Sequence, residues 1–184
     1  KNYNDKDEVT LTYLNNSRDT IVSFGNNFSG KQKLKLQKGA NKFSWNMYHD
    51  GATDFEGMIL WWASLSGPKA VPGEYFVDLN VNGQVTSKTF NILIDPRSES
   101  SISEMQEQFN FISAINETVD KAHKSIKKLR NIKVQLSKFI KEYSKKDLNE
   151  LIDKASTLEA KLSDIEKELY QTQNRSGQDP LNFP

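Results

Sequence analysis

The residues best suited to chemistry by type and spacing lie in one polar stretch of the chain. His49, Asp50, Asp54 and Glu56 place an imidazole and three carboxyl groups within residues 49–56, and such groups can bind a metal ion or transfer protons. A zinc site needs ligands at a fixed spacing, which one histidine with scattered acids does not provide. Glycoside hydrolysis needs two carboxyl groups that flank one bond at a defined separation, and it is the less favoured alternative. We therefore predict an ordinary polar loop, with no catalytic residue, metal ion or cofactor.

Aromatic side chains surround this loop, namely Trp45, Tyr48, Phe55, Trp61 and Trp62. Large aromatic residues dominate burial in protein cores, so packing or an interdomain contact is the favoured interpretation. Two adjacent tryptophans in a strand face opposite sides, so one of Trp61 and Trp62 would reach a surface or an interface. The alternative is a carbohydrate-binding module, in which exposed rings of Trp45, Tyr48, Trp61 or Trp62 stack on sugars.

The composition argues against several classes of partner. The 184 residues include 25 basic and 24 acidic side chains, for a net charge of +1, so no general attraction to nucleic acid is expected. The basic stretch 121–146 is interpreted as a solvated helix face that pairs with acids of the next helix. Cysteine is absent, which removes disulfides and thiolate metal sites. No apolar run approaches the ~20 residues that cross a bilayer, so no membrane span is predicted.

The elements that would position these groups include a β-hairpin over residues 71–97. Alternating side chains on both sides of Asn82-Gly83 indicate two strands, because a type I′ turn needs positive φ at both central residues. Pro72-Gly73 opens the hairpin, and Pro96 ends it because proline cannot donate to a ladder. Further short strands are predicted at residues 8–14, 20–24, 32–36, 41–46 and 58–62. About seven short strands in residues 1–97 are typical of an Ig-like β-sandwich.

After the hairpin, the apolar period changes from two to three or four, which indicates helices. Ser101 and Glu104 form a capping box that begins the first helix, and Ser144 and Asp147 form a second box. The apolar positions of each stretch line one helical seam. We therefore predict a long antiparallel α-helical hairpin, packed as a coiled coil, over residues 98–174. The fold class is α+β, with the sheet and the helices segregated.

The two predicted helices differ in length, at about 42 and about 27 residues, or ~63 Å and ~40 Å. The second helix would cover the first only back to about Val119. The apolar residues left without a helical partner are Ile102, Met105, Phe109, Ile112 and Ile115. Either the β-domain packs there or a further element does. We expect a third helix beyond the tail, residues 175–184, in a longer native chain; the alternative is a homodimer through the helices.

Separated motifs carry a family resemblance. A tryptophan-led segment matches at Trp45, Asn46 and Tyr48, with Asn46 in place of the usual acid. The other motifs are GMILW at 57–61, GP-x-A-x-PG-x-Y at 67–75, DPR at 95–97 and the ending ELYQTQNRSGQDPLNFP at 168–184. They are similar to the C-terminal region of a family of large bacterial proteins, common in Bacteroidetes. Members carry an N-terminal sortilin-type or Asp-box β-propeller and are often labelled glycosyl-hydrolase-like.

The resemblance covers most of the chain and implies a non-catalytic accessory module rather than an enzyme. Its partner would be the β-propeller of the same parent chain, and a glycan or another protein could join it, in an extracytoplasmic location. Any hydrolytic or ligand-binding activity would belong to the propeller. The β-part also resembles the Ig-like domain of flagellar hook-capping proteins. Structural and interface roles are implied for Trp45, Gly57, Trp61, Gly73, Tyr75 and Asp179.

Overall fold

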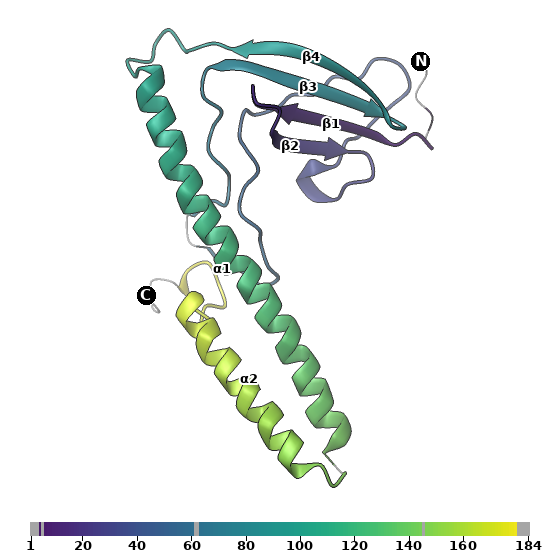
Figure 1. Ribbon diagram of the computed structural model, residues 1–184, viewed down its shortest axis with the longest axis vertical. Coiled ribbons are helices and arrows are strands. Elements are labelled where there is room, and N and C mark those ends of the chain that lie inside the picture. Colours follow the sequence, from purple (N-terminus) through teal and green to yellow (C-terminus); the bar gives the residue numbers. More distant parts are fainter. Residues whose placement is uncertain (1–3, 5, 61–62, 145, 180–184) are drawn as a thin grey trace. The chain divides into compact units, whose positions relative to one another are not determined.

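The computed structural model describes residues 4, 6–60, 63–144 and 146–179. These residues form a four-stranded antiparallel sheet and two long helices (Figure 1). The fold is therefore α+β, with a sheet followed by a helical hairpin, as the sequence predicts. The chain groups into two compact units. The sheet unit comprises Lys1–Asp50 and Ser66–Ser113, and the helical unit comprises Gly51–Leu65 and Ala114–Pro184.

The sheet has the strand order β2-β1-β3-β4, and every neighbouring pair is antiparallel. Its strands are β1 (Val9–Leu14), β2 (Thr20–Gly25), β3 (Gly73–Val81) and β4 (Gln84–Ile92). The predicted turn between β3 and β4 is confirmed, because Asn82 and Gly83 have φ values of 52° and 85°. These values fit a type I′ turn, whose twist matches that of the strands it joins.

Other predicted strands do not form in the described residues. Residues 32–36, 41–46 and 58–60 contain no strand, and residues 61–62 of the last prediction lie outside the described residues. A short 3-10 helix, η1 (Gly30–Gln32), and the isolated bridges Gly25 to Lys33 and Tyr48 to Lys69 occur in this part of the sheet unit.

The apolar alternation in residues 41–46 arises from contact with a sheet face. The ring centroid of Phe43 lies 4.6 Å from that of Phe24, and the ring of Trp45 stacks on Tyr13 at 4.5 Å. An extended segment that lays alternate side chains on a sheet has the same period of two as a strand inside the sheet. The strand prediction for these residues was wrong for that reason.

The core of the sheet unit lies on this same face. Its buried residues are Ile21, Val22, Ala70 and Tyr75, and the side chains packed around them are Tyr13, Phe24, Trp45, Met47, Phe90 and Ile92. The Tyr75 hydroxyl donates to the Val71 carbonyl at 2.6 Å. This hydrogen bond satisfies the polar end of a ring that is otherwise buried.

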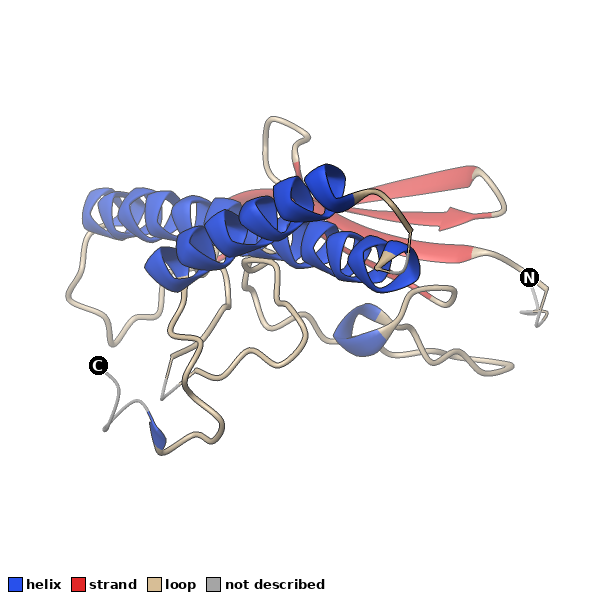
Figure 2. Ribbon diagram, turned by 90° about the horizontal axis from the view of Figure 1, so that it is seen from below, coloured by secondary structure: helices blue, strands red, loops and turns tan. Residues whose placement is uncertain are grey.

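Helix α1 (Ile102–Tyr143, 42 residues) begins at the predicted capping box. The Ser101 N–H donates to Glu104 Oε2 at 2.7 Å, and the Glu104 N–H donates to Ser101 Oγ at 3.2 Å. Helix α2 (Asn149–Leu169, 21 residues) runs back beside the C-terminal part of α1 within the helical unit (Figures 1 and 2). No helix in the described part of the chain is long and apolar enough to cross a membrane.

The second capping box was predicted wrongly. The residue that precedes α2 is Leu148, and it makes no side-chain cap. The Ser144 hydroxyl donates back to the Lys141 carbonyl at 3.1 Å, so this serine closes α1 instead of opening α2. Helix α2 therefore starts later and is shorter than the about 27 residues expected from the apolar pattern.

Part of the apolar surface at the start of α1 is covered within the sheet unit. The ring centroid of Phe109 lies 4.8 Å from that of His49. Met105, Phe109 and Ile112 also line a cleft together with residues of the loops beside the sheet. Packing by the β-domain is thus the arrangement observed for these three residues, whereas Ile102 and Ile115 are exposed.

Candidate functional site

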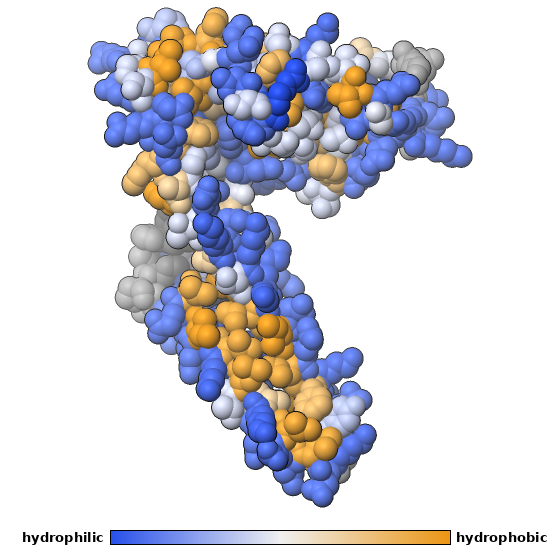
Figure 3. Space-filling model, viewed as in Figure 1, coloured by the Kyte–Doolittle hydropathy of each residue, from blue (hydrophilic) through white to orange (hydrophobic). Residues whose placement is uncertain are grey.

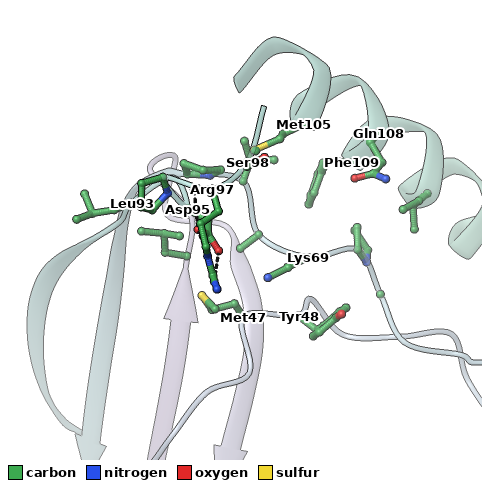
Figure 4. Close-up of a pocket in the computed structure, with 18 residues that line it drawn as sticks. Met47, Tyr48, Lys69, Leu93, Asp95, Arg97, Ser98, Met105, Gln108 and Phe109 are labelled. Atoms are coloured by element: carbon green, nitrogen blue, oxygen red, sulfur yellow. Dashed lines mark hydrogen bonds and ion pairs between the residues drawn. The ribbon is translucent and has the colours of Figure 1, made fainter. Parts of the chain in front are cut away.

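A cleft of about 840 Å³ lies in the sheet unit (Figure 4). It is lined by residues 67–72, residues 92–93 and 95–98, and the first turns of α1, together with Met47 and Tyr48. Its apolar wall includes Met47, Val71, Ile92, Met105, Phe109 and Ile112. A concave and mostly apolar surface of this size is typical of sites that bind a small molecule or a peptide side chain.

Close backbone contacts hold the cleft wall in place. The Ala70 N–H donates to the Met47 carbonyl at 2.7 Å. Gly67 permits the approach of the two segments, because a Cβ at this position would lie 2.3 Å from the Asp50 carbonyl oxygen and 2.6 Å from that of His49. Only glycine fits at a contact this short.

The charged groups of the cleft are few, and two of them are paired. Arg97 donates through Nε and Nη2 to the Asp95 carboxylate, at 2.9 and 2.7 Å (Figure 4). These hydrogen bonds from Arg97 lower the pKa of Asp95, so the carboxylate stays ionised. Asp95 is the only carboxyl group among the described residues that line the cleft. The wall therefore does not offer the two acids that glycoside hydrolysis requires.

The polar loop residues singled out in the sequence divide between the two units. His49 belongs to the sheet unit, and burial lowers its pKa. Burial raises the pKa of Asp50, against the effect of a hydrogen bond of 2.9 Å that Gln32 donates to it. Asp54 and Glu56 are exposed residues of the helical unit. Within the described residues, no group of three or more histidines and acids could hold a metal ion.

Trp45 is engaged in packing. Its ring stacks on Tyr13 with 26° between the ring planes, and its Nε1 donates to the Tyr48 carbonyl at 2.9 Å. Tyr48 is 41% exposed and lines the cleft. Trp61 and Trp62 lie outside the described residues. Of the four aromatic residues considered for sugar binding, only Tyr48 is described as an exposed ring.

A buried cluster in the helical unit was missed by the sequence analysis. The Phe55 ring meets His123 and Tyr170 edge-on, with centroid distances of 5.1 and 5.0 Å. The guanidinium of Arg130 lies 4.7 Å from the centroid of Phe55 and donates through Nε to Glu166 at 2.7 Å. Phe55 comes from a loop and the other residues from the two helices. The spacing of residues along the chain therefore does not predict the cluster. The one local indication is that Arg130 and Glu166 directly follow Leu129 and Ile165, which are apolar residues of the predicted helical seams.

Glu166 is almost fully buried but remains charged. It is 4% exposed, and its second oxygen accepts from Lys133 Nζ at 3.0 Å. Burial raises its pKa, but the hydrogen bonds from Arg130 and Lys133 and their charges outweigh this effect, so the pKa is lowered. The predicted pairing between helices is confirmed for this acid. Because the carboxylate is held by two cations, the cluster joins α2 to α1 and provides no free acid.

Helix α2 also carries apolar residues that stay exposed. Leu151, Leu158, Ile165 and Leu169, here called the α2 stripe, are 50%, 44%, 50% and 42% exposed. Figure 3 shows apolar side chains gathered over the helical hairpin. The buried residues of the same helix are Ala155 and Glu166. Helix α2 therefore has one buried side and, beside it, an apolar side open to solvent.

The chain shows no significant match to any protein-family model, curated protein or solved structure. The resemblance to the C-terminal region of propeller proteins thus stays a prediction from the motifs. The geometry of the cleft, the buried cluster and the α2 stripe is what bears on function.

Proposed function

We propose that this chain is a non-catalytic accessory module that acts by protein–protein contact, with the α2 stripe as its contact surface. The observation that carries the proposal is the exposure of large apolar residues along one side of a helix. A surface helix normally turns its apolar side towards a core. Contiguous apolar surface that remains exposed on a soluble unit is typical of an interaction site.

The spacing of the stripe selects the kind of partner. Leu151, Leu158 and Ile165 recur every seven residues, which is the period at which two helices pack along a common seam. The partner is therefore a helix. It would be the third helix expected from the sequence, supplied by the same parent chain, or the equivalent surface of a second copy. A helix in the same chain is favoured because a tethered partner has a high effective concentration.

The proposal also includes the type of each unit, the parent protein and its location. The sheet unit would be an Ig-like domain in which irregular segments replace the second sheet, and the hairpin would pack as a coiled coil. The parent protein would supply an N-terminal β-propeller and would be extracytoplasmic. The support for these statements is the motif resemblance, with which an antiparallel sheet and a helical hairpin are compatible.

Two observations support the non-catalytic part of the proposal. Among the described residues of the cleft wall, Asp95 is the single carboxyl group, and Arg97 donates a hydrogen bond to it at 2.7 Å. The buried acid Glu166 is likewise held by two cations. Carbohydrate binding stays an alternative prediction that no specific contact favours, because Trp45 packs against Tyr13.

Photocrosslinking in the producing organism tests the proposal. A benzophenone side chain in place of Leu158 should cross-link to the partner, because Leu158 lies in the α2 stripe. The partner residues that are cross-linked should belong to a helix. The matched control is Ala160, which is also exposed but lies about 200° around the helix. Equal yields at the two positions, or none at Leu158, would contradict the proposal.

A further inference from the structure

The two edges of the sheet are protected differently. Along β2, the Gly25 carbonyl accepts the Leu34 N–H at 2.9 Å, and the Ile21 carbonyl accepts the Asp50 N–H at 3.2 Å. Along β4, no backbone hydrogen bond from the described residues reaches the outer edge. One edge is thus covered by segments of the same unit, and the other is open (Figure 1).

The turn determines which backbone groups β4 presents at this edge. Val81 and Gln84 flank a two-residue turn, so they exchange hydrogen bonds as a pair. In an antiparallel ladder such pairs alternate with pairs whose N–H and C=O groups point away. The residues of β4 that present these groups to the open edge are Val85, Ser87, Thr89 and Asn91.

Strand β4 has few of the features that prevent edge pairing. It is nine residues long, contains no proline and pairs with β3 without a register shift. Its only charged residue is Lys88. Val85 at its start is 58% exposed, and Leu93, directly after its end, is 82% exposed. A long, regular edge with exposed apolar residues at both ends is a template for another strand.

We propose that the β4 edge binds the β4 edge of a second copy of this chain, antiparallel, with the two-fold axis at Thr89. The two sheets then become one continuous sheet. This surface lies in the sheet unit and is independent of the α2 stripe. A second copy fits this edge because the edge is complementary to itself in one particular register.

The register follows from the residues that would face each other. Residues with outward backbone groups must oppose one another, so a full-length pairing places the axis at residue 87, 88 or 89. An axis at Lys88 would set two lysines directly opposite each other, which is destabilising. An axis at Ser87 would leave Leu93 beyond the paired region.

An axis at Thr89 avoids both problems. It sets Val85 opposite Leu93 of the second copy, so the two most exposed apolar side chains of the edge cover each other at both ends. It also sets Lys88 opposite Phe90 of the second copy, where an ammonium group can approach an aromatic ring. Two β-branched threonines meet at the axis, and threonine pairs are favourable across strands.

Disulfide trapping tests the dimer and its register, and the absence of cysteine leaves the background clean. Thr89→Cys should form a cross-linked species of twice the 21.0 kDa chain mass on mild oxidation. The controls are Ser87→Cys and Asn91→Cys, whose two copies would lie about 14 Å apart in this register. A disulfide spans at most ~7 Å between Cα atoms, so Thr89→Cys should react at least about tenfold faster than either control.

Sedimentation equilibrium of the unmodified chain is a second, independent test, because it measures the oligomeric state directly. We expect a reversible dimer that Thr89→Pro weakens, because proline removes an outward N–H but none of the bonds to β3. Thr89→Val keeps that N–H and should dimerise like the unmodified chain. A monomer at the highest soluble concentration would overturn the proposal. Faster trapping at Ser87 than at Thr89, or a dimer that Thr89→Pro leaves unchanged, would overturn it as well.

Discussion

Glu166 shows how a single residue joins the two helices. Its carboxylate is buried, yet it stays charged because Arg130 and Lys133 each donate to one of its oxygens. The charge pattern of residues 121–146 predicted pairing between the helices, but on a solvated face. Charge patterns indicate which side chains attract each other, but not how much water their neighbours exclude. Here the ring of Phe55, which comes from a distant loop, lies against Arg130 and helps to exclude water from the ion pair.

Replacement of this acid should destabilise the helical unit in a pH-dependent way. Glu166→Gln should lower the free energy of unfolding at neutral pH by about 1.5–3 kcal/mol, the range for hydrogen bonds to charged groups. The pKa of Glu166 is lower in the folded chain than in the unfolded chain. Its contribution is therefore complete above the ordinary glutamate pKa of ~4.3 and is lost as the pH falls through the folded-state value.

Urea unfolding at several pH values measures this effect. The difference between the unmodified chain and Glu166→Gln should shrink as the pH falls below ~4. Glu168→Gln is the matched control, because Glu168 is an exposed acid on the same helix. A difference that does not depend on pH, or one shared by the control, would contradict the role assigned to the Glu166 carboxylate.

Gly67 is required by close packing at the cleft wall. In Gly67→Ala, the new Cβ would meet the carbonyl oxygens of Asp50 and His49 at 2.3 and 2.6 Å, and both are backbone atoms that cannot swing aside. We expect a loss of about 1–3 kcal/mol, as for other overpacked sites. Thermal unfolding of Gly67→Ala and of Gly177→Ala measures this loss. Gly177→Ala is the control, because a Cβ at that position would have nothing within 4 Å. Equal stability of the two variants would argue against this close contact.

Among the connecting elements, residues 51–60 form a loop that hydrogen bonds attach to the helices of the same unit. The Thr53 N–H donates to Asp120, and the Thr53 carbonyl accepts from Nδ1 of His123 at 2.6 Å. Arg130 donates to the Glu56 carbonyl, and the Ile59 N–H donates to the Tyr170 hydroxyl. These side chains satisfy backbone groups that a loop cannot pair by itself. His123 is one of these anchors.

Removal of one anchor should loosen the loop. Tyr170→Phe deletes the hydroxyl that accepts the Ile59 N–H at 2.7 Å, and the loss should be about 1 kcal/mol. Hydrogen exchange of the Ile59 amide, followed by NMR, should become faster. Tyr143→Phe is the control, because Tyr143 packs on Phe139 through its ring and its hydroxyl holds no loop amide in the described residues. Unchanged exchange at Ile59 in Tyr170→Phe would refute the anchoring role.

Residues on the two sides of α1 should differ sharply in their effect on stability. Ile126 is fully buried, with 0% exposure, whereas Val134 on the same helix is 67% exposed. Ile126→Ala should cost about 2–5 kcal/mol, and Val134→Ala should stay within ~0.5 kcal/mol. Chemical unfolding followed by far-UV circular dichroism measures both. Similar losses for the two variants would mean that the core of the hairpin is not centred on Ile126.

The elements that could be predicted from the sequence are those that local signals determine. Asn82-Gly83 specifies the hairpin through backbone conformation, and the Ser101 capping box specifies the start of α1. The irregular coverage of the sheet by residues 41–46 could not be predicted, because the same alternation arises with or without a ladder. The cleft and the buried cluster could not be predicted either, since each combines residues from segments far apart in the chain.

In the molecule as a whole, the two-helix hairpin does not cover its own apolar surface within the described residues. Helix α2 uses Ala155 and Glu166 on its buried side and leaves the α2 stripe half exposed. Two helices enclose little volume, and most helical stability in proteins comes from tertiary packing of an apolar side. A partner helix that covers the stripe would therefore stabilise α2 as well as bind to it.

The most direct test is the deuterium uptake of α2, residues 149–169, measured by mass spectrometry in two samples. One sample is the purified chain of 184 residues, and the other is the protein isolated from its producing organism together with whatever it is joined or bound to. We expect fast exchange of α2 in the first sample and strong protection in the second, while the strands of the sheet unit exchange at similar rates in both. Equal exchange of α2 in the two samples would contradict the central claim that the stripe is a contact surface.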